Sequence, residues 1–107
     1  VYIYSLLSLT TTDSSPPEIP KRFELRQNYP NPFNPKTTIQ FGLPKFSHVS
    51  LIVFDIMGRK VDELINTDLN AGVHTVVWDA QNHPSGIYIV KMITQDFTKT
   101  QKIILLK

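Results

Sequence analysis

The feature that most constrains the fold is a proline-rich segment at residues 27–35. Three prolines fall within residues 30–35, so three backbone donors are lost and three φ angles are fixed. The residues that precede these prolines are pushed to extended or turn geometry. The segment is therefore expected to form neither a helix nor a central strand. Its two aromatic side chains, Tyr29 and Phe33, are expected to anchor it.

Directly after this segment the sequence alternates strictly between apolar and polar positions. One face of residues 37–43 carries Thr37, Ile39, Phe41 and Leu43. This period of two predicts a strand with one buried side. Further strands are predicted over residues 49–54, 59–65, 72–79, 87–94 and 98–106, with turns at residues 55–58 and 81–86 and a polar loop at residues 66–70. The fold class is all-β, and we expect an antiparallel β-sandwich of about seven strands.

The predicted core includes Trp78, for which there are two interpretations. An exposed tryptophan stacks on sugars in carbohydrate-binding modules, whereas alternation with Val76 favours a buried position. Tyr88 lies between two isoleucines and is expected to be structural. The predicted core side chains are those of Ile39, Phe41, Leu51, Val53, Val76, Trp78, Tyr88 and Ile104.

The 107 residues divide into three parts. Residues 23–107 are long enough for one hydrophobic core. Residues 10–22 are rich in hydroxyls and proline and are expected to be a linker. Residues 1–9 resemble an apolar strand, which either ends an upstream domain, pairs with an edge of the following domain, or is donated to a neighbouring copy. No stretch reaches transmembrane length, so no membrane insertion is expected.

The residue types argue against an enzyme, a metal site and a cofactor. The absence of cysteine excludes disulfides, thiolate metal sites and cysteine nucleophiles. The net charge is +2, and the dispersed basic residues do not form the stripe that nucleic acid requires. The carboxylates of Asp55 and Asp79 are expected to close turns. The histidines match no metal spacing, and the serines lie in no nucleophile-elbow pattern; these residues are His48, His74 and His83, and Ser47, Ser50 and Ser85.

The C-terminal segment is an apolar strand between two lysines. Composition alone favours an edge strand whose charged ends discourage aggregation. The alternative is an address that a receptor recognises. In that case, removing the segment is expected to abolish recognition while much of the sandwich survives. The segment consists of Lys102, Ile103, Ile104, Leu105, Leu106 and Lys107.

Residues 23–107 resemble the type A C-terminal sorting domain of the type IX secretion system. They are also similar to the immunoglobulin-like domain of the flagellar hook-capping protein, although residues 79–85 are shorter than in those relatives. The resemblance is carried by Asn31, Pro32, Phe33, Asn34 and Pro35, then by Gly58, Gly72, Trp78, Gly86 and Tyr88, and finally by the segment 102–107.

The resemblance implies an immunoglobulin-like sandwich that directs an exported cargo protein across the outer membrane. Its partners would be the outer-membrane secretion machinery, which recognises the terminal strand, and an upstream cargo domain. The cargo would pass through the periplasm and be secreted or displayed on the surface of a Gram-negative bacterium. Two alternatives remain: a fibre subunit that binds copies of itself by donating residues 1–9, and a carbohydrate-binding module.

Overall fold

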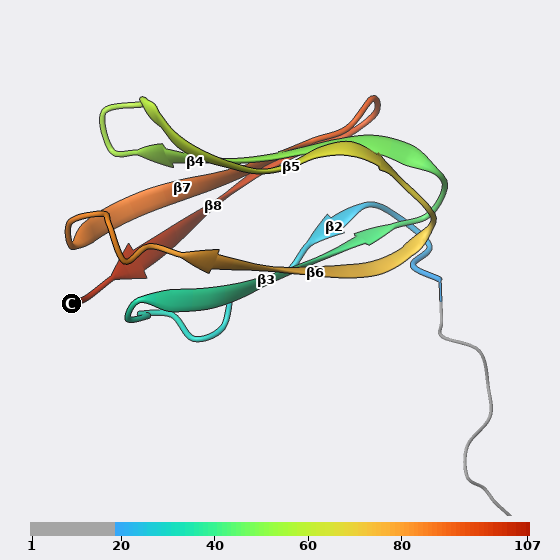
Figure 1. The fold of residues 1–107 in the computed structure, drawn as a ribbon. Coiled ribbons are helices and arrows are strands. Elements are labelled where there is room, and N and C mark those ends of the chain that lie inside the picture. Colours follow the sequence, from blue (N-terminus) through green and yellow to red (C-terminus); the bar gives the residue numbers. More distant parts are fainter. Residues whose placement is uncertain (1–18) are drawn as a thin grey trace, which may run out of the picture.

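A computed structural model of the chain describes residues 19–107 and contains two packed antiparallel sheets (Figure 1). One sheet has the order β2-β3-β6 and the other β5-β4-β7-β8. This arrangement confirms the predicted all-β sandwich. The predicted strand at residues 1–9 and most of the linker at residues 10–22 lie outside the described residues. The strands are β2 (Glu24–Leu25), β3 (Lys36–Leu43), β4 (Ser47–Asp55), β5 (Lys60–Leu69), β6 (Gly72–Asp79), β7 (Gly86–Ile93) and β8 (Thr98–Leu105).

The core fills the space between the two sheets. Trp78 is 1% exposed, so its indole has no free face on which a sugar can stack. Its Nε1 donates to Asp62 Oδ2 at 2.9 Å, which satisfies the one polar atom of the ring. Val76 is partly buried and packs against the core. The other confirmed core positions are Ile39, Phe41, Leu51, Val53 and Tyr88.

One core prediction is wrong, because the side chains that β8 buries are Ile103 and Leu105 rather than Ile104. Residues 103–106 are all apolar, so the sequence has no alternation there to identify the inward face. The inward face is determined by pairing with β7, where Ile103 stands opposite Tyr88. Both side chains therefore project into the core.

A second correction concerns β5, which extends into the predicted loop at residues 66–70 and ends at Leu69. Residues 66–69 pair with the start of β4, where Ser50 stands opposite Asn66 and His48 opposite Asp68. Tertiary pairing therefore overrides the weak strand propensity of these polar residues.

The connection between β4 and β5 is the predicted tight turn. Asp55 Oδ1 accepts hydrogen bonds from the backbone N–H groups of Met57 and Arg59, both at 2.9 Å. Gly58 has a φ of 83°, a left-handed conformation that favours glycine. The backbone bonds to Asp55 lower the pKa of its carboxyl group, and the Arg59 side chain adds to this effect. Asp55 therefore closes the turn as a charged acceptor.

The loop between β6 and β7 is held by Tyr88. Its hydroxyl donates to the carbonyl oxygen of Pro84 at 2.6 Å. This bond ties the start of β7 to the loop that precedes it. Burial raises the pKa of the Tyr88 hydroxyl, and the charge of Asp55 raises it further. The hydroxyl is therefore a neutral donor over the physiological pH range.

Candidate functional site

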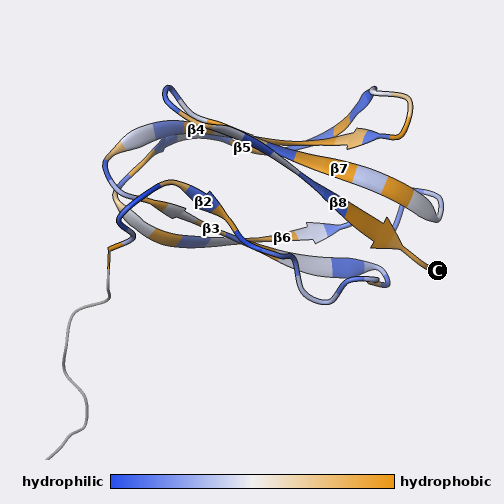
Figure 2. Cartoon of the chain, turned by 180° about the vertical axis from the view of Figure 1, so that it is seen from behind, coloured by the Kyte–Doolittle hydropathy of each residue, from blue (hydrophilic) through white to orange (hydrophobic). Residues whose placement is uncertain are grey.

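The terminal strand β8 lies at the edge of the four-stranded sheet and pairs only with β7 within that sheet. Its register is continuous from the pair Gly86–Leu105 to the pair Ile93–Thr98. Figure 2 shows that β8 changes from hydrophilic to hydrophobic toward the C-terminus. Since the hydrogen-bonding direction alternates along a strand, every second residue of β8 directs its backbone groups away from β7.

The proline-rich segment covers the outer edge at the end of β8. Phe33 N–H donates to the carbonyl oxygen of Ile104 at 2.9 Å, and Leu106 N–H donates to the carbonyl oxygen of Phe33 at 3.0 Å. These two bonds form a short parallel bridge. Asn31 Oδ1 accepts from the backbone N–H of Ile104 at 3.0 Å. Family-motif positions at the start of the domain therefore hold its last residues in place.

A second contact joins Gln101 of β8 to residues at the N-terminal end of the proline-rich segment. In the amide orientation that satisfies both ends, Gln101 donates to the carbonyl oxygen of Arg26 at 2.7 Å and accepts from the N–H of Asn28 at 3.0 Å. Among residues 19–107, no backbone partner covers the outward groups of Thr100 and Lys102. The edge of β8 is thus open in its first half and covered near its end.

The two aromatic residues of the proline-rich segment differ in their positions. Phe33 is buried and packs against Trp78 with a centroid separation of 5.7 Å, as predicted for an anchor. Tyr29 is 79% exposed, so its prediction as an anchor is wrong. The backbone of Tyr29 exchanges two hydrogen bonds with Thr38, and the side chain of the preceding Asn28 occupies the buried position instead.

The six predicted recognition residues are divided between the core and the surface. Ile103 and Leu105 are buried, and the intervening Ile104 is partly exposed on the outer face of the sheet. Leu106 is 57% exposed. Lys107 is bound to the loop between β6 and β7, where its N–H donates to Ser85 Oγ at 2.9 Å and its Nζ to the carbonyl oxygen of Gln81 at 2.6 Å. Lys102 is exposed.

Three neighbours on the outer face were not identified from the sequence as members of this site. Ile87 stands opposite Ile104, Ile89 opposite Lys102, and Phe54 opposite Ile89. The available signal was the run over residues 87–90, which is apolar on both faces of the strand. In an antiparallel strand with one face in water, apolar residues would alternate with polar ones.

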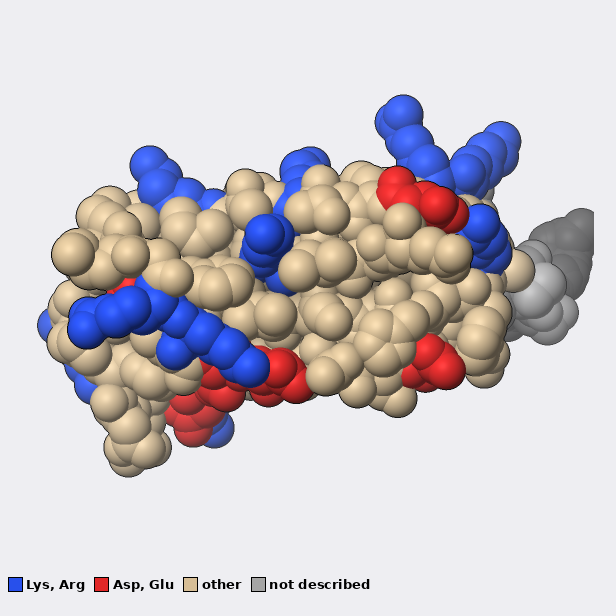
Figure 3. Space-filling model, turned by 90° about the horizontal axis from the view of Figure 1, so that it is seen from above, with Lys and Arg blue, Asp and Glu red and all other residues tan. Residues whose placement is uncertain are grey.

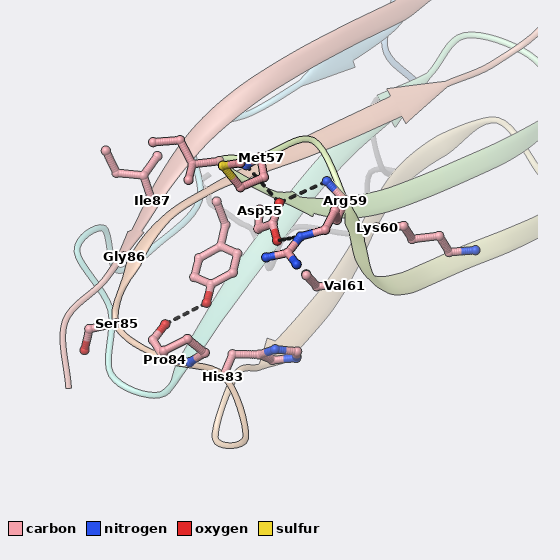
Figure 4. Close-up of a pocket in the computed structure, with 12 residues that line it drawn as sticks. Asp55, Met57, Arg59, Lys60, Val61, His83, Pro84, Ser85, Gly86 and Ile87 are labelled. Carbon is pink, nitrogen blue, oxygen red and sulfur yellow. Dashed lines mark hydrogen bonds and ion pairs between the residues drawn. The ribbon is translucent and has the colours of Figure 1, made fainter.

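A hollow of about 510 Å³ lies beside the chain end, between the β4–β5 turn and the β6–β7 loop (Figure 4). Its polar groups are largely engaged: Asp55 binds the turn and Arg59, and the Tyr88 hydroxyl binds Pro84. Ile56 and Met57 are exposed at its rim. These contacts make the hollow a structural feature of the two loops and leave no paired acid and base in its wall.

The three histidines lie in separate environments. His74 stacks on Phe41 and its Nε2 donates to the carbonyl oxygen of Asn70 at 2.7 Å. His83 lies 5.5 Å from Trp78 between ring centroids. No group of three histidine, cysteine or acidic residues in the described part of the chain is arranged to hold a metal ion. Nor does any helix there have the length and apolarity needed to cross a membrane.

We expect the pKa of His48 to lie above its ordinary value of 6.5. The larger cause is the hydrogen bond of its ring to Asp68, and the hydrogen bond to Asn66 raises the pKa further. A raised folded-state pKa stabilises the fold most below pH 6.5, and this contribution is lost as the pH rises through the folded-state value. The substitution Asp68→Asn should lower the pKa of His48, as measured by NMR titration of its ring protons. An unchanged titration would show that Asp68 does not hold the imidazole.

The described chain is thus a β-sandwich whose terminal strand is accessible from one face and one edge. The family model described as a secretion system C-terminal sorting domain matches residues 27–106, so the chain belongs to that family. No curated protein matches the chain.

Members of this family are the sorting signal of the type IX secretion system. The sorting domain is the tail of a cargo protein that the secretion machinery handles. Family membership therefore implies export to the cell surface or the extracellular space. The match does not support the fibre or carbohydrate-binding alternatives.

Proposed function

We propose that the secretion machinery recognises the folded sandwich through the surface of its terminal segment. The contact residues are the exposed members of this segment, Lys102, Leu106 and Lys107, together with the partly exposed Ile104. The observation that carries the proposal is that the proline-rich motif fixes the position of the segment at Ile104 and Leu106. The family motif and the terminal segment then form one unit, in which the motif holds the terminal segment in the position that the machinery recognises.

This proposal gives the buried residues Ile103 and Leu105 a structural role. Their side chains attach the segment to the core, and the intervening side chains project outward. Recognition by strand addition is confined to the open first half of the edge, near Thr100 and Lys102, because backbone groups near the end already have partners. The cargo would cross the periplasm with this surface exposed and leave the cell through the outer membrane. The domain itself performs no chemistry in this proposal.

The double substitution Lys102→Ala and Lys107→Ala should reduce export without unfolding the domain. Surface substitutions of this kind usually change stability by about 0.5 kcal/mol or less. The measurement is the fraction of a reporter, fused upstream of residues 1–107, that leaves the periplasm of a type IX-secreting bacterium. The matched control is Lys21→Ala with Lys36→Ala, which removes the same charge from exposed positions elsewhere.

A short deletion completes this test. Removing residues 102–107 also removes the buried side chains of Ile103 and Leu105, so that deletion does not separate recognition from core packing. Deleting only Leu106 and Lys107 preserves both core side chains, so this variant should fold, as circular dichroism would verify, and should remain in the periplasm. Normal export of both folded variants would show that the terminal segment is not the recognised surface.

A further inference from the structure

An apolar patch lies on the outer face of the four-stranded sheet, beside the end of β8. We define this apolar patch as Phe54, Ile87, Ile89 and Ile104. Phe54 stands opposite Ile89, and Ile87 opposite Ile104, so these side chains project to one side of the sheet. Ile87 is 37% exposed and the other three are partly exposed. The partly buried side chains that pack against the core come from other positions.

The composition of this face differs from that of the other sheet. In an antiparallel sandwich, the side chains opposite the core are usually polar because they face water. On the outer face of the other sheet, β3 carries Thr38 and Gln40, and the exposed Val73 and Val77 of β6 stand opposite Gly42 and Thr38 rather than opposite apolar side chains. On the outer face of β7, only Lys91 interrupts a series of isoleucines at positions 87, 89 and 93. The four-stranded sheet therefore differs in that its outer apolar side chains stand opposite one another across neighbouring strands.

Two lysines border the apolar patch. Lys102 stands opposite Ile89, and Lys91 follows Ile89 on the same face of β7. The ion pairs among residues 19–107 involve neither lysine. Figure 3 views the molecule from this side and shows dispersed basic side chains, with acidic side chains gathered toward the margins of the face. The patch therefore combines apolar area with two positive charges that form no ion pair within the described residues.

We propose that the apolar patch, with Lys91 and Lys102, docks a component of the secretion machinery that presents apolar side chains bordered by carboxylates. The inference rests on the proposed recognition of the terminal segment and extends it to β7 and β4. Ile104 and Lys102 belong to both surfaces, so the patch is continuous with that segment. Carboxylates on the partner would complement the two lysines and direct the encounter.

Two other occupants fit these observations less well. In a two-fold dimer, each copy would bring its own Lys91 and Lys102 to the shared interface, where the like charges repel. An anionic lipid surface attracts each lysine by about 1 kcal/mol, so two lysines provide weak anchoring.

The first test replaces Ile87 and Ile89 with threonine in the full chain fused to the export reporter. Threonine keeps the β-branched shape and the strand propensity, and it removes apolar contact area. We expect the exported fraction to fall about tenfold, as for the loss of one central interface contact. The matched control is Val73→Thr with Val77→Thr on β6, where the exposed fractions are 41% and 54%. The control should be exported normally.

The second test reverses a charge and does not depend on packing. Lys91→Glu should lower export, because it opposes the partner's carboxylates. Lys99→Glu makes the same change in net charge at an exposed position of β8. The side chain of Lys99 projects from the opposite face of β8 to that of Lys102 and Ile104, so it faces away from the patch. Lys99→Glu should leave export unchanged. Circular dichroism and thermal unfolding of the purified variants establish that each is folded.

The outcomes separate this inference from the proposed role of the terminal segment. Normal export of folded Lys91→Glu and of the folded isoleucine variant would overturn the docking patch, even if the terminal-segment variants remain in the periplasm. Equal loss of export in the patch variants and their controls would also overturn it. Patch-dependent binding of the wild-type chain to phosphatidylcholine–phosphatidylglycerol vesicles, or patch-dependent dimerisation in sedimentation, would identify a lipid or a second copy as the occupant instead.

Discussion

Replacing Trp78 with alanine is expected to lower the free energy of unfolding by about 3–5 kcal/mol, as for other large-to-small changes in a core. The indole is buried between Phe33 and Tyr88, with centroid separations of 5.7 Å and 5.3 Å. Its removal leaves a cavity and also leaves the carboxylate of Asp62 without the indole donor. Urea denaturation followed by circular dichroism measures the change.

The matched control is Tyr29→Ala, which removes an aromatic side chain that is exposed to solvent. It should change the free energy of unfolding by about 0.5 kcal/mol or less. Trp78 is the only tryptophan in the chain, so its fluorescence also reports burial, and the emission should be blue-shifted in the native state. A loss below about 1 kcal/mol for Trp78→Ala would show an exposed indole and revive the sugar-binding interpretation.

The strands were predictable where one face is buried and the other is polar. Residues 37–43 alternate as expected for β3, and the predicted bounds of β6 agree with Gly72–Asp79. The turn at residues 55–58 was also predictable, because aspartate and glycine supply the side-chain acceptor and the left-handed conformation that it requires. Local chemistry determines these elements, so a local pattern was sufficient to find them.

The candidate site was less predictable, because nonlocal pairing determines it. The inward face of β8 depends on its pairing with β7, and the apolar run over residues 103–106 contains no information about that choice. The bridge between Phe33 and Leu105 joins the two ends of the domain and has no local signal. The sequence singled out the terminal segment as a candidate, but its division into buried and exposed side chains required the register.

The proline-rich motif is expected to be essential for folding because of its contact with β8. Phe33→Ala should lower the free energy of unfolding by about 3–5 kcal/mol, since the ring is buried against Trp78. Asn31→Ala should cost less, about 0.5–1.5 kcal/mol, because it removes one hydrogen bond to a backbone amide. Asn34→Ala is the control, since Asn34 is exposed and its side chain makes no hydrogen bond within residues 19–107.

Hydrogen exchange distinguishes a contact that holds the terminal segment from a general loss of stability. In Asn31→Ala, the amide of Ile104 should exchange faster, because its acceptor is the Asn31 side chain. The amide of Ile103 should remain protected, since the alternation along β8 directs it toward β7. Phe33→Ala should accelerate exchange throughout the sandwich. If the Ile104 amide exchanges equally fast in the wild type and in Asn31→Ala, and the Leu106 amide is unprotected in the wild type, the motif does not hold the terminal segment. The link between the family motif and the sorting surface would then be wrong.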